Sequence, residues 1–239
     1  MTSLETGRDR REAVAALLAA LDAEPWTIVG LDFAFSWPRW YLDAEGLADA
    51  GDAWRRAGEL AVVPARLLPR PFWGAGIRRL ADAGLEGRER YRLTETTPGA
   101  AAAGARSTFH AGGNGTVGLQ SIRGMPHLAE LRRAGVAVWP FDVPRARSPI
   151  AVEIFPRMIA RRLAPGGASG VTFRAGVVGA LPVAALAGVA LARDLALANQ
   201  DAFDAAVSAI ALSRDEIAPE APVGEAAARE GWIWGARLA

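Results

Sequence analysis

The sequence predicts an α/β fold, and three features support this. A helical pattern over residues 9–23 leads into an apolar run rich in β-branched and aromatic residues, Thr27–Phe35. A second apolar run, Ile150–Phe155, leads into a helical segment, Arg157–Leu163. Alternation of helices and buried strands is typical of α/β proteins. The length of 239 residues suits one large domain or two small ones, and we expect a single domain, 1–239.

The first helix and strand follow from local patterns. Val14, Leu17, Leu18 and Leu21 recur at helical spacing, and Pro25 is expected to end the helix. The run Thr27–Phe35 is expected to be a strand buried on both faces of a parallel sheet. Alternation along this strand places Ile28, Gly30 and Asp32 on one face.

The segment 36–148 is less regular and is expected to be an insertion that walls one side of a cleft. Eight prolines interrupt it, and five tryptophans are candidates for a satellite core. Within it we expect a loop at 96–106, a glycine-rich loop at 111–118, a short helix at 127–134 and a strand at Val136–Phe141.

The C-terminal part returns to regular patterns. The strand Ile150–Phe155 ends at Pro156, and a helix is expected at 181–198 after a glycine-rich break. Asn199 suits the N-cap of a further helix, Asp201–Leu212. The motif GWIWG at residues 231–235 is expected to be an aromatic anchor.

Composition excludes several kinds of chemistry. The chain has no cysteine, which excludes disulfides and thiol catalysis and fits a reducing compartment. It has no lysine, which excludes Schiff-base enzymes and phosphate-binding loops that require lysine. With two histidines and no cysteine, a metal site would be built from carboxylates, which favours Mg²⁺ or Mn²⁺. The net charge of +1 argues weakly against extended duplex binding.

Location follows from the same reasoning. The first residues are polar, so we expect no signal peptide. No run of about 18 uninterrupted apolar residues occurs, so no membrane span is expected. A cytoplasmic protein is therefore expected, while the sequence leaves its oligomeric state open.

Four acidic residues are candidates for a catalytic or metal site. Asp32 lies near the carboxyl end of a buried strand, where ligands bind in open α/β sheets. Asp201 and Asp204 share one face of a helix, in its first turn. Glu153 lies within an apolar strand and needs a cationic partner, either a metal or an arginine. Each also has a structural alternative: a loop cap for Asp32, an arginine pair for Glu153, and ordinary N-terminal helix acids for Asp201 and Asp204.

Phosphate binding has its own candidates. The backbone of Gly112, Gly113 and Gly115 is suited to form an anion-binding nest, with Arg123 as a bidentate clamp. A plain loop is the alternative explanation of these glycines. His110 is a candidate general acid or substrate ligand, whereas His127 is expected to be structural.

Five segments together resemble the family known as domain of unknown function 429, which is described as ribonuclease H-like nucleases. They are GLDFAFSWP (30–38), FHAGGNGTVGLQSIRGMP (109–126), WPFD (139–142), VEIFPR (152–157) and DAFDAAVSAI (201–210). They cover most of the chain in the family's order.

The resemblance implies a ribonuclease H-like mixed sheet flanked by helices, with nucleic acid as the partner. It implies two-metal hydrolysis of phosphodiester bonds, with Asp32, Asp201 and Asp204 as ligands and Glu153 less firmly assigned. Superfamily members begin with a β-hairpin whose first strand carries a metal-binding aspartate. This sequence lacks such a strand before Asp9, so we expect a missing hairpin. The alternatives are a non-catalytic binding module and a small-molecule phosphate enzyme on the same fold.

Overall fold

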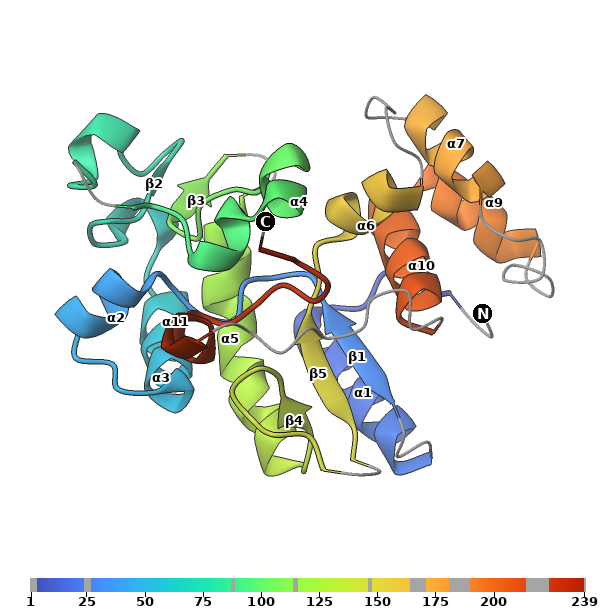
Figure 1. Cartoon of the computed structure of the whole chain (residues 1–239), viewed down its shortest axis with the longest axis horizontal. Coiled ribbons are helices and arrows are strands. Elements are labelled where there is room, and N and C mark those ends of the chain that lie inside the picture. The colour runs from blue at the N-terminus through green and yellow to red at the C-terminus, as the bar shows by residue number, and fades with distance from the viewer. Residues whose placement is uncertain are drawn as a thin grey trace.

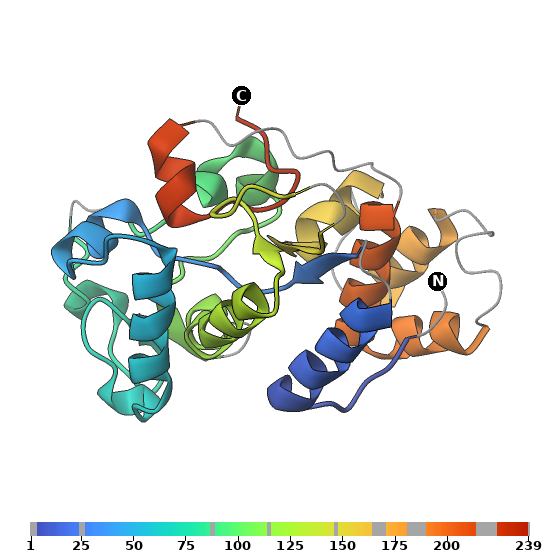
Figure 2. The same cartoon turned by 90° about the horizontal axis from the view of Figure 1, so that it is seen from below.

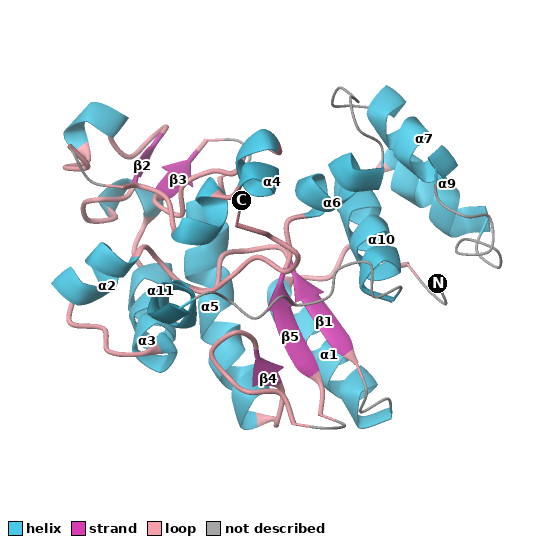
Figure 3. Ribbon diagram, in the orientation of Figure 1, coloured by secondary structure: helices cyan, strands magenta, loops and turns pink. Residues whose placement is uncertain are grey.

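The computed structural model describes residues 4–23, 27–86, 89–113, 116–145, 148–163, 171–180, 190–213 and 224–238. It confirms a mixed α/β architecture, with a small parallel sheet flanked by helices (Figures 1 and 3). None of the helices in this part of the chain combines the length and apolar character needed to cross a bilayer.

The main sheet has three parallel strands in the order β1-β5-β4. They are β1 (Ile28–Leu31), β5 (Ile150–Glu153) and β4 (Ala137–Val138). Leu31 of β1 lies opposite Glu153 of β5, so the two strands end level with each other. β1 is at the edge of the sheet and Ile28 is 38% exposed. The strand is therefore less buried than expected at its first residue, although helices cover both of its faces.

Two helices, α1 (Arg10–Ala23) and α5 (Val117–Arg133), lie on the same side of β1 (Figure 2). Val29 of β1 belongs to the core cluster into which Leu17 and Leu18 of α1 pack. On the other face of β1 lies α10 (Gln200–Ser213). A Cβ at Gly30 would lie 2.9 Å from Cδ1 of Leu212, so the missing side chain lets α10 approach this closely.

The segment 36–148 belongs to the main core and does not form a separate satellite core. It supplies β4 to the main sheet, and its Trp37 and Trp54 are fully buried in the cluster that also contains Val29. Its remaining elements are α2 (Arg39–Ala44), α3 (Ala50–Ala61), α4 (Pro98–Ala102), β2 (Trp73–Gly74), β3 (His110–Gly112), and the 3-10 helices η1 (Ala65–Leu67), η2 (Leu80–Asp82) and η3 (Leu93–Thr96).

The helix expected at 127–134 is the C-terminal half of the longer α5, which contains Pro126. Proline cannot donate the usual helical hydrogen bond. Its ring instead faces α3, where a Cβ at Gly58 would lie 3.7 Å from Cγ of Pro126. Packing of α3 along α5 therefore outweighs the local signal for a helix end.

The C-terminal elements are α6 (Pro156–Leu163), α7 (Val171–Ala180), α9 (Ala190–Ala198), α10 and α11 (Gly224–Glu230). The side chain of Asn199 accepts a hydrogen bond from the N–H of Ala202, which confirms it as a helix cap. The expected break before residue 181 contains α7, and residues 181–189 of the expected helix lie outside the described residues, as does Pro25.

The aromatic motif near the C-terminus packs into the second core cluster. Trp232 and Trp234 are buried, as expected of an anchor. The N–H of Trp234 donates to the carbonyl oxygen of Glu153 at 2.8 Å, and Ile233 forms a parallel bridge with Glu153. The C-terminal segment therefore adds backbone hydrogen bonding at the last residue of β5.

Candidate carboxylate site at the end of the parallel strands

Asp32 directly follows the last residue of β1, at the end of the sheet where β1 and β5 both finish. Asp32 lies two residues beyond Gly30 in the strand direction, which places it about 7 Å from the point where Gly30 meets Leu212. Asp204 lies eight residues back along α10, roughly 12 Å from Leu212 along the helix axis. The charges of Asp204 and Asp201 act on Asp32, so the start of α10 lies near the end of β1. That the three acids share one cation stays a prediction.

The negative charges around Asp32 perturb its protonation. Desolvation by the surrounding protein is the largest cause that raises the pKa of Asp32 to about 7, followed by the charges of Asp204, Glu153 and Asp201. The residue nevertheless has an exposed surface, so water reaches it. Repulsion from the neighbouring acids therefore acts on a carboxylate that is still in contact with solvent.

Asp204 is half-buried at the start of α10, and burial raises its pKa to about 6. The charge of Asp201 acts in the same direction, while a hydrogen bond from Nε2 of Gln200 and the charge of Arg174 oppose it. Arg174 belongs to α7 and bonds Gln200 at 3.0 Å. The sequence reasoning missed this arginine because α7 was not expected.

The donor set is suited to a hard cation but is sparse. Among the described residues, no group of three or more His, Asp or Glu side chains is close enough to hold one metal ion. A hydrated Mg²⁺ is commonly bound through only one or two carboxylates. The acids therefore fit one hydrated ion better than the two-ion site expected from the resemblance.

Glu153 has the cationic partner that the sequence requires, and it is an arginine. Nη1 of Arg92 donates to Oε2 of Glu153 at 2.8 Å, and Nη2 donates to Oε1. The backbone N–H of Phe35 also donates to Oε2, at 3.0 Å. Both oxygens are therefore engaged, which favours the structural alternative for Glu153 over a catalytic role.

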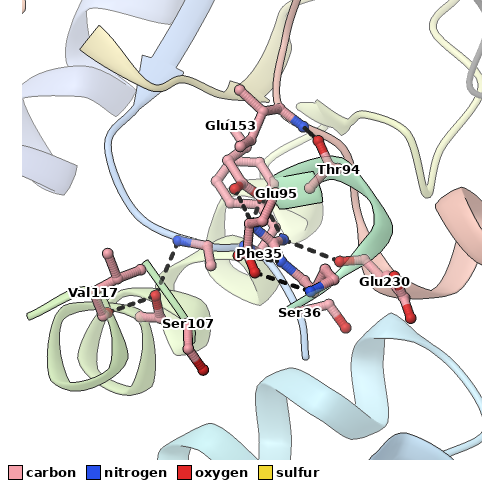
Figure 4. Close-up of polar contacts among 12 residues, drawn as sticks. Phe35, Ser36, Thr94, Glu95, Ser107, Val117, Glu153 and Glu230 are labelled. Carbon is pink, nitrogen blue, oxygen red and sulfur yellow. Dashed lines mark hydrogen bonds and ion pairs between the residues drawn. The ribbon is translucent and has the colours of Figure 1, made fainter. Parts of the chain in front are cut away.

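Arg92 is the centre of a buried polar network. Its partners Glu95, Glu153 and Glu230 are labelled in Figure 4. Its Nε donates to Glu95 at 2.9 Å, and its Nη1 also donates to the carbonyl oxygen of Glu230 at 3.0 Å. The side chain of Glu230 accepts from the N–H groups of Arg39 and Leu93. Because one arginine serves two acids, burial raises the pKa of Glu95 to about 7 even though Arg92 opposes the shift.

Two pockets share Asp32, Phe33 and Gln120 in their walls. The smaller, of about 50 Å³, is also lined by Arg92, Arg106 and Glu153. The larger, of about 230 Å³, lies toward α1 and α5 and is mostly apolar. Arg92, Glu95, Arg106 and Gln120 all belong to 36–148, so this segment does wall one side of the site.

The candidate phosphate-binding residues lie elsewhere. Gly112 and Gly113 line a different groove, and Gly115 lies outside the described residues. Arg123 is exposed on α5 and lines neither pocket that contains Asp32. A Cβ at Gly112 would lie 2.2 Å from the carbonyl oxygen of Ala75, so this glycine permits close backbone contact. The expected clamp around Asp32 is therefore not formed by these residues, and the arginines that line the smaller pocket are Arg92 and Arg106.

The two histidines differ in setting. His110 begins β3 and stacks on Trp73, and burial together with the charge of Arg106 lowers its pKa. His127 lines the larger pocket and contacts Glu130 at 3.3 Å. Neither lines the smaller pocket with Glu153 and Arg106.

The chain has no match among protein-family models, among curated proteins or among solved structures. Membership of the domain of unknown function 429 family therefore stays a prediction.

Proposed function

We propose that this chain is a metal-dependent nuclease in which Asp32 and Asp204 hold a divalent cation and Asp201 adds negative charge. The observation that carries the proposal is the position of Asp32, at the end of a parallel strand, where the charges of Asp204 and Asp201 act on it. Desolvation is the largest cause of its raised pKa, and repulsion from the neighbouring acids raises it further. A bound cation would remove that repulsion.

The cation, Mg²⁺ or Mn²⁺, would supply Lewis-acid polarisation of a phosphate oxygen. The chain's own residues would position the substrate. Arg106 and Gln120 line the same pocket as Asp32, and an arginine beside the acids offers a charged donor to phosphate. Hydrolysis transfers water oxygen to phosphorus, breaks one phosphorus–oxygen bond and leaves the displaced oxygen protonated.

A ribonuclease H-like fold is part of this proposal. Its support is an acid at the end of an edge strand and two acids at the start of a C-terminal helix packed on that strand. Glu153 is left out of the ligand set because Arg92 and Phe35 already engage its oxygens. It would instead fix the loop that follows Asp32.

The second candidate is a non-catalytic binding module. It is favoured by the lack of a three-ligand metal group in the described part of the chain. Here the acids would be structural and the pockets would serve binding alone. Metal binding separates the two candidates.

The test is calorimetric titration with Mn²⁺ and Mg²⁺, followed by cleavage assays on single-stranded, duplex and branched nucleic acids. Asp32→Asn and Asp204→Asn should each abolish cation binding and cleavage. Asp194→Asn, which neutralises an exposed acid on α9, serves as the matched control and should change neither. Absence of both cation binding and cleavage in the unmodified chain would favour the binding module.

A further inference from the structure

A second site is built on the parallel pair β2–β3. An open groove of about 650 Å³ is lined there by the side chains of Trp73, Arg79 and His110 and by Gly112 and Gly113. None of these residues lines the pockets that contain Asp32. The groove therefore needs an explanation of its own.

The groove contains a preformed aromatic platform. Trp73 and His110 are paired in the parallel register, and their rings stack with centroids 4.1 Å apart and planes at 15°. Both side chains are only partly buried. Nε1 of Trp73 is buried without a hydrogen-bond acceptor among the described residues, so a ligand acceptor or an ordered water would satisfy it.

Glycines hold this platform in place. Gly74 has a φ of 134°, and a Cβ there would lie 2.4 Å from the backbone of Gly112. The two chains therefore approach more closely than any other residue type would allow. The stacked pair is fixed by backbone contact, so little ordering is required when a ligand binds.

Positive charge accompanies the platform. Arg78 is engaged by carbonyl groups of the preceding loop, including that of Pro69 at 2.8 Å. Arg79, in contrast, has 88% of its side chain exposed. Its ion pair within the described residues joins Nε to a carboxylate oxygen of Asp82 at 3.3 Å, and this pair is open to solvent. Such a pair is easily replaced by a phosphate. The charge of Arg106 lowers the pKa of His110, and Arg106 also lines the smaller pocket that contains Asp32. One positive charge is therefore close to both sites.

We propose that this groove binds an unpaired nucleobase of a single-stranded nucleic acid, stacked on the Trp73–His110 pair with its phosphate at Arg79. Flat rings beside an exposed guanidinium are the combination that recognises single strands, because every base has a face that stacks. In a duplex the bases already stack on each other, and the net charge of +1 provides little general attraction to a duplex. The inference rests on the proposed nuclease function for its biological meaning, since it names the substrate class.

The experiment measures binding separately from cleavage. A dye-labelled single-stranded oligonucleotide of about ten nucleotides is titrated in EDTA and followed by fluorescence anisotropy. The variants are Trp73→Leu, Trp73→Phe, His110→Leu and Arg79→Ala. Arg133→Ala, at an exposed position of α5, is the matched control for the loss of one positive charge. Thermal unfolding checks that each variant is folded.

Trp73→Leu should weaken binding about tenfold, while Trp73→Phe keeps most of the affinity because a ring remains. His110→Leu and Arg79→Ala should each weaken it, and Arg133→Ala should not. Equal affinity of the folded Trp73→Leu variant, or equal competition by an abasic sugar-phosphate polymer or a neutral oligosaccharide, would overturn the proposal. Asp32→Asn should still bind the strand in EDTA, so loss of the nuclease function leaves this site independently testable.

Discussion

Arg92 donates hydrogen bonds to both carboxylate oxygens of Glu153, and the two side chains are only 1% and 4% exposed. The guanidinium therefore meets the carboxylate edge to edge, in the bidentate geometry that gives the strongest charged hydrogen bonds. Because the N–H of Phe35 shares Oε2, the pair also fixes the loop that begins at Asp32. Stability and site geometry are linked through this contact.

Removing one member of this pair should be costly. Glu153→Gln leaves the buried Arg92 charge with less compensation, and we expect a loss of about 3–5 kcal/mol in the free energy of unfolding, measured with urea. The double variant Arg92→Met with Glu153→Gln should lose less than the two single variants together. As a control, Arg55→Met at the exposed pair with Glu59 should leave the midpoint unchanged. A strictly additive double variant would show that the two groups are not coupled.

Asp32 should make stability depend on pH. Its folded pKa of about 7 lies above its ordinary value of 3.8, so the native state holds a proton that the unfolded state has released. Stability from this group is full below about pH 4 and is lost as pH rises to about 7. Because Asp32 is exposed, solvent screening makes this loss of stability smaller than the full pKa shift implies.

We therefore expect Asp32→Asn to raise the melting temperature at pH 8 more than at pH 4. Mg²⁺ should raise the melting temperature of the unmodified chain at pH 8 and have little effect at pH 4, where the acids are protonated. Asp194→Asn provides the comparison for loss of one exposed negative charge. An identical Mg²⁺ effect in Asp32→Asn would remove this residue from the ion's ligands.

Gly112→Ala should destabilise the fold. The added methyl would lie 2.2 Å from the carbonyl oxygen of Ala75, so β2 and β3 would have to separate, at a cost of about 1–3 kcal/mol. Gly176→Ala is the matched comparison, because it lies in α7 with open space around it and should add up to about 1 kcal/mol of stability. Calorimetric unfolding of both variants tests the contrast, which equal melting temperatures would contradict.

Gly124→Ala should alter the Asp32 site without unfolding the chain. A Cβ at Gly124 would lie 2.7 Å from a ring carbon of Phe33, and this ring lines both pockets that contain Asp32. We expect the ring to move and Mn²⁺ affinity to fall several-fold, as measured by calorimetry. Unchanged affinity would show that the ring position has no influence on the acids.

Much of the sheet and of the acidic site is predictable from local patterns. The apolar runs around Val29 and Ala151 give β1 and β5, because buried strands need continuous apolar sequence. The predicted packing of an apolar helix on β1 is found at Gly30, whose face meets α10. Asn199 is recognisable as a cap from its position before an apolar helix.

The partners of Glu153 are not predictable in this way. Arg92 is 61 residues away in sequence, in a segment without helical or strand periodicity, so only the tertiary fold brings it to β5. The glycine-rich segment misled the phosphate expectation because glycine serves two purposes. At Gly112 it permits backbone contact, and composition alone does not separate this use from a ligand-binding loop.

The C-terminal segment that bonds Glu153 and Leu93 has a consequence for the order of events during synthesis. Glu230 and Trp234 are translated well after β5 and Arg92, yet they hold backbone groups of β5 and of the segment around Arg92. While these residues remain inside the ribosome, the buried arginine and its acids lack part of their hydrogen bonding. The sheet and its core can collapse during elongation, but closure of the charged interior waits until residues 230–234 have left the ribosome.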